Sequence, residues 1–257
     1  MRTTTEGTAP ARSRAFRGLP AFFWTEVLVQ ANELTAMATS MVIQGVVLVF
    51  VWILDPSLLG IAFVGALIFS MFTMGQRLLN EAAYIRIDHK ANDLYLASPL
   101  SPEGYFLGMA GGILFVYITP VIVMGILAEI VVRFTLPEVA LLLALCLCVW
   151  ISSASIGYTF STFFRDNRAI WAYASLFFTT FGVVFPVFYP LTAFPASLQP
   201  IALLLPPSAA ASLMQAAIGA IPVATSRIVF AALALVAETA ALFGFAIYWA
   251  RRTVREG

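Results

Sequence analysis

The sequence is poor in charge and has almost no lysine or histidine. Only 11% of its 257 residues are charged, Lys90 is the only lysine and His89 is the only histidine. A phosphate-binding loop needs a lysine between a glycine and a serine or threonine, whereas Lys90 stands in IDHKAND. A serine protease triad and an HExxH metal site also lack the histidines that they need. We therefore expect no catalytic residue, metal site, cofactor or ATPase activity on this chain.

Cysteine is also scarce, since Cys146 and Cys148 are the only two. Because the two cysteines are two residues apart on a predicted helix, their side chains point to different sides of it. We interpret them as buried thiols and exclude a disulfide or a metal site. The net charge of +1 offers no basic surface to neutralise phosphates, so we expect no nucleic-acid partner.

Apolar residues, by contrast, make up 61% of the chain, more than a soluble domain needs. They form six runs of roughly 18 to 27 residues, each long enough to cross a hydrocarbon core of about 30 Å. This pattern predicts an all-α integral membrane protein in which residues 1–257 form a single transmembrane domain. The six predicted transmembrane helices are 36–54, 58–76, 104–130, 137–163, 169–189 and 227–250.

The distribution of arginine and lysine predicts the orientation. All the basic residues except Arg133 and Arg227 fall on one side of the predicted spans, and basic residues resist translocation. We therefore expect a multi-pass protein of the cell membrane with both termini in the cytoplasm. The first 35 residues are polar for too long to be a signal peptide, so the first span is expected to remain.

Residues 19–34 have the pattern of an amphipathic helix. Phe23, Trp24 and Val27 share one face, and Glu26 and Gln30 lie on the opposite face. This pattern predicts a helix in the cytoplasmic membrane interface, in contact with lipid and with Trp24 at headgroup level. The alternative is an ordinary helix that packs on its own protein.

The loop after the second span is too long for a simple turn. Asp93 can cap a short helix that Pro99 ends, and Ser101 can cap the third span. Three glycines at intervals of four then form a flat face on which another backbone can pack. They are Gly104, Gly108 and Gly112.

Between Pro186 and Pro222 lie seven of the fourteen prolines. The apolar pieces between them are too short to span a membrane. Residues 190–225 are therefore predicted to form a re-entrant outer hairpin of short helices that dip into the outer leaflet, with their backbone shielded by protein or facing water.

Four residues within the spans are candidates for a translocation path. Glu238 and Gln44 are polar groups in predicted spans, where a charge costs about 2.5 to 3.5 kcal/mol unless it is paired, protonated or in a cavity. The alternative for Glu238 is a hydrogen bond to a neighbouring helix. Phe181 and Phe185 belong to an aromatic stripe that can meet an apolar substrate, or simply face lipid and core.

The whole chain resembles a permease subunit of the type 2 ATP-binding-cassette exporter family. The resemblance rests on the amphipathic entry helix, the six spans, the proline-rich outer hairpin and, above all, the loop from 86 to 101. There, charged residues precede a leucine-rich segment that ends in Ser-Pro, and a glycine enters the third span. The matching residues are Arg86, Asp88, Lys90, Asp93, Leu94, Leu96, Ser98, Pro99, Leu100 and Gly108. Family members often have Gly-Thr before the leucines, where this chain has Asn92 and Asp93.

The resemblance implies that residues 86–101 form a coupling helix that docks into a groove on a separate ATPase subunit. The short turn Phe164, Arg165, Asp166 would be a second, smaller contact. Two copies of the ATPase would bind MgATP. Two permease chains, identical or different, would form the translocation path, with spans one and five near the interface between the two chains.

Two rival hypotheses remain. A secondary transporter can be built from inverted three-helix repeats, with spans one to three and four to six as the repeats. Against this, the spans carry few embedded charges. A non-transporting membrane scaffold is also compatible with six spans.

Overall fold

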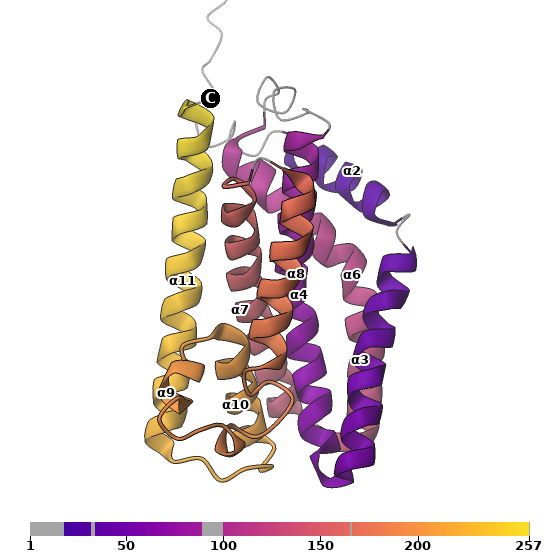
Figure 1. The fold of residues 1–257 in the computed structure, drawn as a ribbon, viewed down its shortest axis with the longest axis vertical. Coiled ribbons are helices and arrows are strands. Elements are labelled where there is room, and N and C mark those ends of the chain that lie inside the picture. Colours follow the sequence, from indigo (N-terminus) through magenta and orange to yellow (C-terminus); the bar gives the residue numbers. More distant parts are fainter. Residues whose placement is uncertain (1–17, 32–33, 89–99, 165, 257) are drawn as a thin grey trace, which may run out of the picture.

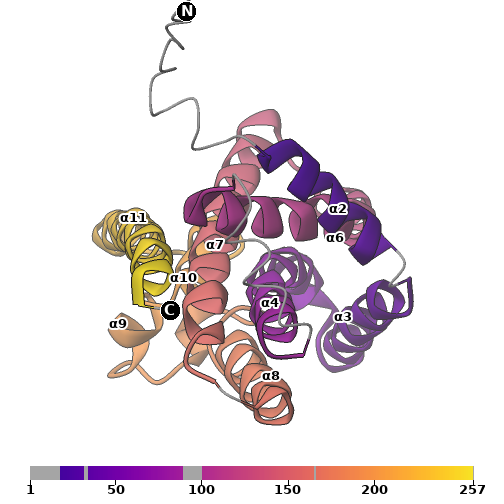
Figure 2. The ribbon, with the colours of Figure 1, turned by 90° about the horizontal axis from the view of Figure 1, so that it is seen from above.

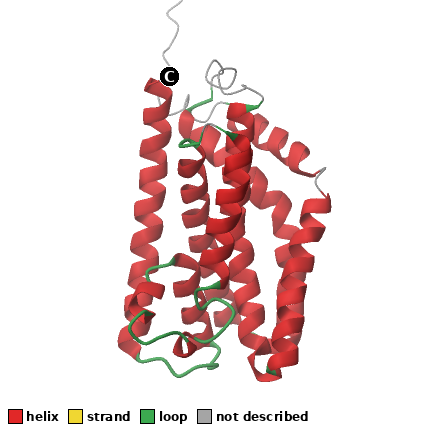
Figure 3. Cartoon of the chain, in the orientation of Figure 1, coloured by secondary structure: helices red, strands yellow, loops and turns green. Residues whose placement is uncertain are grey.

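The computed structural model describes residues 18–31, 34–88, 100–164 and 166–256. Within these ranges the chain forms helices and loops and no strand (Figure 3). The long helices lie along one axis (Figure 1), namely α3 (Leu34–Leu54), α4 (Leu59–Ile87), α6 (Pro102–Val132), α7 (Leu136–Ser161), α8 (Asn167–Val183) and α11 (Thr225–Glu256). The short helix α2 (Leu19–Ala31) lies at the end of the bundle where α11 finishes, which we call the upper end. The all-α prediction is confirmed.

Five of the long helices, α3, α4, α6, α7 and α11, are long and apolar enough to cross a membrane. The sixth, α8, is apolar but has only 17 residues. The predicted end of this span at residue 189 is wrong, since the helix ends at Val183. Pro186 explains the difference, because its ring clashes with the preceding turn and it has no N–H to continue the helix.

The helix that contains the second predicted span, 58–76, is longer than that span, because α4 continues to Ile87. Leu78, Leu79, Ala82 and Ile85 are buried along this extension. They recur at helical spacing, so the segment is an amphipathic helix that packs on the bundle. Runs of continuous apolar residues do not detect such a segment.

Helix α4 is the centre of the bundle, surrounded by α3, α6, α7 and α8 when seen from above (Figure 2). Its backbone touches that of α7. A Cβ at Gly157 would overlap the carbonyl oxygen of Gly75, and one at Gly75 would overlap that of Ser153. The Ser153 hydroxyl also donates a hydrogen bond to the Met71 carbonyl oxygen over 3.1 Å. Small residues therefore allow the two backbones to approach this closely.

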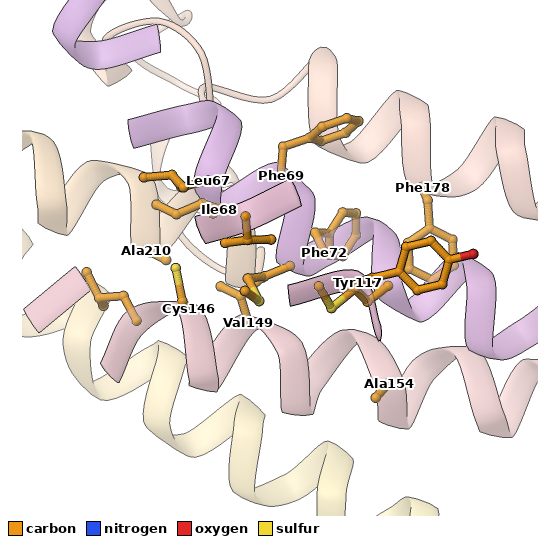
Figure 4. Packing of buried hydrophobic residues seen from close by; sticks show 14 of the residues in the cluster. Leu67, Ile68, Phe69, Phe72, Tyr117, Cys146, Val149, Ala154, Phe178 and Ala210 are labelled. Carbon is orange, nitrogen blue, oxygen red and sulfur yellow. The ribbon is translucent and has the colours of Figure 1, made fainter. Parts of the chain in front are cut away.

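Large side chains fill the core on either side of this crossing (Figure 4). Phe72 of α4 packs on Phe178 of α8 with ring centroids 5.0 Å apart. Val149 of α7 is fully buried. Cys146 is buried beside it as a free thiol, as predicted, whereas Cys148 is a free thiol that is only half-buried.

Helix α2 packs on the glycines of α6. A Cβ at Gly112 would lie 2.6 Å from the Cβ of Glu26, and one at Gly108 would lie 2.6 Å from the Phe22 ring. Glu26 and Gln30, which form the polar face predicted from the sequence, are both buried against the bundle. Helix α2 therefore packs on its own protein through the face that carries Glu26 and Gln30. Gly104, the third of the predicted glycines, is buried at the start of α6, and its N–H donates to the Ser101 hydroxyl over 3.0 Å.

The predicted hairpin, 190–225, contains η2 (Leu191–Ala193), α9 (Gln199–Ala202) and α10 (Pro206–Ala217) at the lower end of the bundle. Residues 206–215 of α10 are all buried. Helix α10 packs on α4, α7 and α11, so its backbone is shielded by protein. At the same end, η1 (Pro56–Leu58) connects α3 to α4, and Asp55 accepts a hydrogen bond from the Ser57 N–H over 2.9 Å.

Candidate functional site

Arg86 joins the two segments for which the sequence predicted contact with an ATPase. It lies in the last turn of α4, and its guanidinium donates to the carbonyl oxygens of Ser161 and Phe164, the latter over 2.6 Å. Ser161 is the last residue of α7, where carbonyl groups have no partner within the helix and a cation is favoured by the helix dipole, and Phe164 lies in the turn that follows. One side chain therefore links the beginning of the 86–101 segment to the turn between α7 and α8.

The other predicted contact residues lie around this link or outside the described residues. Phe164 packs on Tyr173 of α8 with ring centroids 5.8 Å apart, and Asp166 is exposed. Asp88 caps the end of α4, and Leu100 packs on the core just before α6. Five further predicted residues lie outside the described residues: Asp93, Leu94, Leu96, Ser98 and Pro99. Arg165 does so as well.

A cavity of about 590 Å³ lies between α3, α4 and α8, next to the end of α2. Its walls combine polar and apolar side chains. Gln44 of α3 and Asn80 of α4 line it, and both are buried. Arg77 and Glu81 supply one charge of each sign, and the guanidinium of Arg77 also lies 3.9 Å from the ring centroid of Tyr117. A mixed cavity of this size is typical of a site for a small molecule.

The α4 wall of the cavity was not predicted from the sequence, because the chain after Gln76 was expected to be a loop. The missed signal is a polar stripe at helical spacing that begins above Phe69 and runs to the end of the helix. Its members that line the cavity are Thr73, Gln76, Arg77, Asn80, Glu81 and Tyr84. Their intervals of three and four residues are those of one helix face.

Of the four residues predicted for the path, only Gln44 lines this cavity. Phe181 lies on a separate apolar groove of about 580 Å³ between α7 and α8. Phe185 follows the end of α8 and stacks on Phe181 with ring centroids 5.5 Å apart. The aromatic stripe therefore belongs to a different surface of α8.

Glu238 is also remote from the cavity, because it lies on α11, which is on the far side of the bundle from α3 (Figures 1 and 2). Its buried Oε2 atom has no hydrogen-bond partner. The hydrogen bond between helices comes from its neighbour, because Thr239 and Ser152 of α7 share one over 2.9 Å. Thr239 thus makes the hydrogen bond to a neighbouring helix that was the alternative hypothesis for Glu238.

Next to the upper part of the cavity, Glu26 of α2 is a buried acid. It is 2% exposed, and one of its carboxylate oxygens has no hydrogen-bond partner. Burial, with a smaller contribution from the negative charge of Glu81, raises the pKa of this carboxyl to about 7. Its charge therefore changes near neutral pH.

A comparison with known protein families agrees with this architecture. The family model described as "ABC-2 family transporter protein" matches residues 53–248, which include α4 to α8 and most of α11. The chain belongs to the ABC-2 transporter family. No individual curated protein matches it significantly.

Membership identifies this ABC-2 chain as a transmembrane component of an ABC transporter, a multi-pass membrane protein. Membrane components of this family work with ATPase subunits and are themselves of the permease type. The secondary transporter and the scaffold are therefore not supported.

Proposed function

We propose that this ABC-2 chain is one half of the translocation path of an exporter whose ATPase subunit docks at the upper end of the bundle. The observation that carries this proposal is the link made by Arg86. Because its guanidinium holds the ends of α4 and α7 together, a push on the adjoining 86–101 segment moves both helices as one body. Helix α4 in turn forms a wall of the cavity.

In this proposal the upper end is cytoplasmic. Arg86, Arg251 and Arg252 lie there, in agreement with the positive-inside rule. Residues 86–101 form the coupling segment, and the turn 164–166 forms the second contact. Two ATPase subunits bind MgATP and close, and the permease halves tilt so that the cavity opens outward through the hairpin 190–225.

A second permease chain, identical or related, packs beside α3 and α8. The cavity supports this choice over the opposite side of the bundle, because it lies between these two helices and next to α4, the innermost helix. An apolar face alone would not distinguish α3 from α11, since both are exposed over most of their length.

The decisive experiment is copurification of the ATPase subunit with the Leu96→Asp variant. A buried carboxylate in an apolar docking groove is strongly unfavourable, so we expect the ATPase to be lost from the purified complex. Leu136→Asp is the matched control, because Leu136 is an 82% exposed leucine at the lower end of the bundle and should leave the ATPase bound. Both variants must retain the wild-type melting temperature.

Retention of the ATPase by Leu96→Asp at wild-type stoichiometry would refute docking through this segment. If the wild-type chain purifies with no ATPase at all, the coupling proposal as a whole fails.

A further inference from the structure

Helix α11 extends from one end of the molecule to the other (Figure 1). Its 32 residues, Thr225–Glu256, include no proline, so no proline kink interrupts it. At 1.5 Å per residue it is about 48 Å long. Its first turn lies at the lower end, joined to α10 by the short connection 218–224, and its last turns lie at the upper end. It is therefore one stiff body that reaches both ends of the bundle.

The upper end of α11 is attached to the turn between α7 and α8. The indole N–H of Trp249 donates to the hydroxyl oxygen of Thr162 over 2.9 Å. The Trp249 ring also packs on that of Phe163, with centroids 5.4 Å apart. Thr162 and Phe163 directly precede the turn 164–166, for which we propose the second ATPase contact. Displacement of this turn therefore acts on α11.

A second contact attaches α11 to the far end of the coupling segment. Arg251 forms an ion pair with Glu103, the second residue of α6, just after the 86–101 segment. Arg251 is exposed, so the pair adds little to stability, but it sets which turn of α11 faces the start of α6. Since Arg86 links the beginning of the segment to α7, each end of the segment is connected to a further long helix.

The lower end of α11 is attached to the hairpin 190–225. Arg227, in the first turn of α11, donates to Gln199 Oε1 over 2.7 Å, and the Gln199 amide N–H donates to the Phe194 carbonyl oxygen over 2.9 Å. Gln199 is buried, so breaking either hydrogen bond leaves a polar group unsatisfied at a cost in free energy. A displacement of α11 therefore carries α9 and the loop before it along.

The position of α11 in the bundle allows it to shift. Helix α4 is surrounded by α3, α6, α7 and α8, so it moves only when its neighbours repack. Helix α11 lies at the edge (Figure 2), packs mainly on α7 and α10, and leaves most of its surface exposed. A helix held from one side needs little repacking, and small shear movements of packed helices are a common way to transmit a conformational change.

We infer that α11 transmits the movement of the ATPase to the outer hairpin, and that Arg227 is the positioning residue that couples this helix to α9. The inference rests on the proposed function, because it names the route by which closure of the ATPase subunits reaches the outer end of the path. Displacement enters α11 through Thr162 and Glu103, and Arg227 passes it to Gln199.

The test measures whether nucleotide on the ATPase changes the exposure of the hairpin. The parent chain for this test carries Cys146→Ala, Cys148→Ala and Ser197→Cys, the last at an exposed hairpin position. It is purified with its ATPase in nanodiscs, and the rate of its reaction with fluorescein maleimide is measured with ADP and with ATP plus vanadate. We expect the two rates to differ, because the hairpin moves when the ATPase subunits close.

Adding Arg227→Ala to the parent chain should abolish this difference while the ATPase stays bound and hydrolyses ATP. Arg227→Lys keeps a donor of similar reach and should retain the difference. Arg133→Ala is the matched control, because Arg133 is also an exposed arginine at the lower end but follows α6, and it should leave the difference intact. If Arg227 only holds the hairpin in place, Arg227→Ala will raise both rates by the same factor, and the inference is overturned.

The upper end is tested by charge reversal. Arg251→Glu places a second carboxylate beside Glu103, so it should reduce the difference between the two rates, and the double variant Glu103→Arg with Arg251→Glu should regain it. A full difference in Arg251→Glu would overturn the upper part of the route.

Equal rates in the two nucleotide states of the parent chain, with ATP hydrolysis intact, would overturn the inference while the proposed function stands. If no ATPase copurifies with the parent chain, the proposed function itself fails and this inference fails with it. That outcome is seen before any labelling, so the two failures are distinguishable.

Discussion

At the scale of single residues, this chain keeps several buried polar groups that stability alone does not favour. Gln44 and Asn80 have unpartnered oxygens in the cavity, and Glu26 has one beside it. Leaving such a group unsatisfied usually costs about 1 to 3 kcal/mol. These three residues come from three helices, α2, α3 and α4, that meet in or beside the cavity.

Glu26 makes the stability of the chain dependent on pH. Its carboxyl has a pKa of about 7 in the folded protein, above its ordinary value of 4.5. The folded state therefore binds this proton more tightly than the unfolded state does. The corresponding stability is complete below pH 4.5 and is lost as the pH rises toward 7. We expect the melting temperature in nanodiscs to fall across this window.

Glu26→Gln removes the charge at nearly the same volume, so it should flatten this part of the pH profile and melt higher than wild type at pH 8. Glu129→Gln replaces an exposed glutamate of α6 and should keep the wild-type slope. A Glu26→Gln profile that parallels that of the wild type would assign the slope to another group.

At the scale of elements, the backbones of α4 and α7 come into contact where the two helices cross. The contact depends on Gly75, Ser153 and Gly157. Sites where a side chain would overlap a backbone carbonyl cannot adjust by a rotamer change, so the helices themselves would have to separate.

Gly157→Ala should therefore destabilise the chain by about 1 to 3 kcal/mol, in spite of the better helix propensity of alanine. Gly45→Ala is the control, because Gly45 also lies within a spanning helix and a Cβ there would meet nothing within 4 Å. Thermal melting in nanodiscs measures both. If the two variants melt alike, the α4 and α7 backbones do not constrain the fold at this point.

At the scale of the whole molecule, the cavity suggests which side of the bundle meets the second permease chain. Helices α3 and α11 are both largely exposed and lie on opposite sides (Figure 2). Lipid can cover both, so only the position of the cavity between α3 and α8 distinguishes them.

A photoreactive benzoylphenylalanine at Val46 of α3, which is 62% exposed, should crosslink to a permease chain in native membranes. The same residue at Leu233 of α11, which is 67% exposed, should react with lipid alone. Mass spectrometry of the product identifies the partner, whether it is an identical copy or a relative. Crosslinks to protein from Leu233 and none from Val46 would instead place the interface between the two permease chains at α11.

The sequence by itself determined that this is an all-helical membrane protein, since apolar runs long enough to cross the bilayer follow from the cost of placing polar groups in hydrocarbon. It also predicted the cap at Ser101 and the glycine face of α6, because these depend on neighbouring residues. It missed the extension of α4 and hence Asn80, because a polar stripe on a helix differs from a loop only through what packs against its other face. Likewise, only the tertiary structure showed that Gln44 and Asn80 line the same cavity and that Glu238 lies away from it on α11. The reason is that packing across the whole bundle decides which faces of distant helices meet.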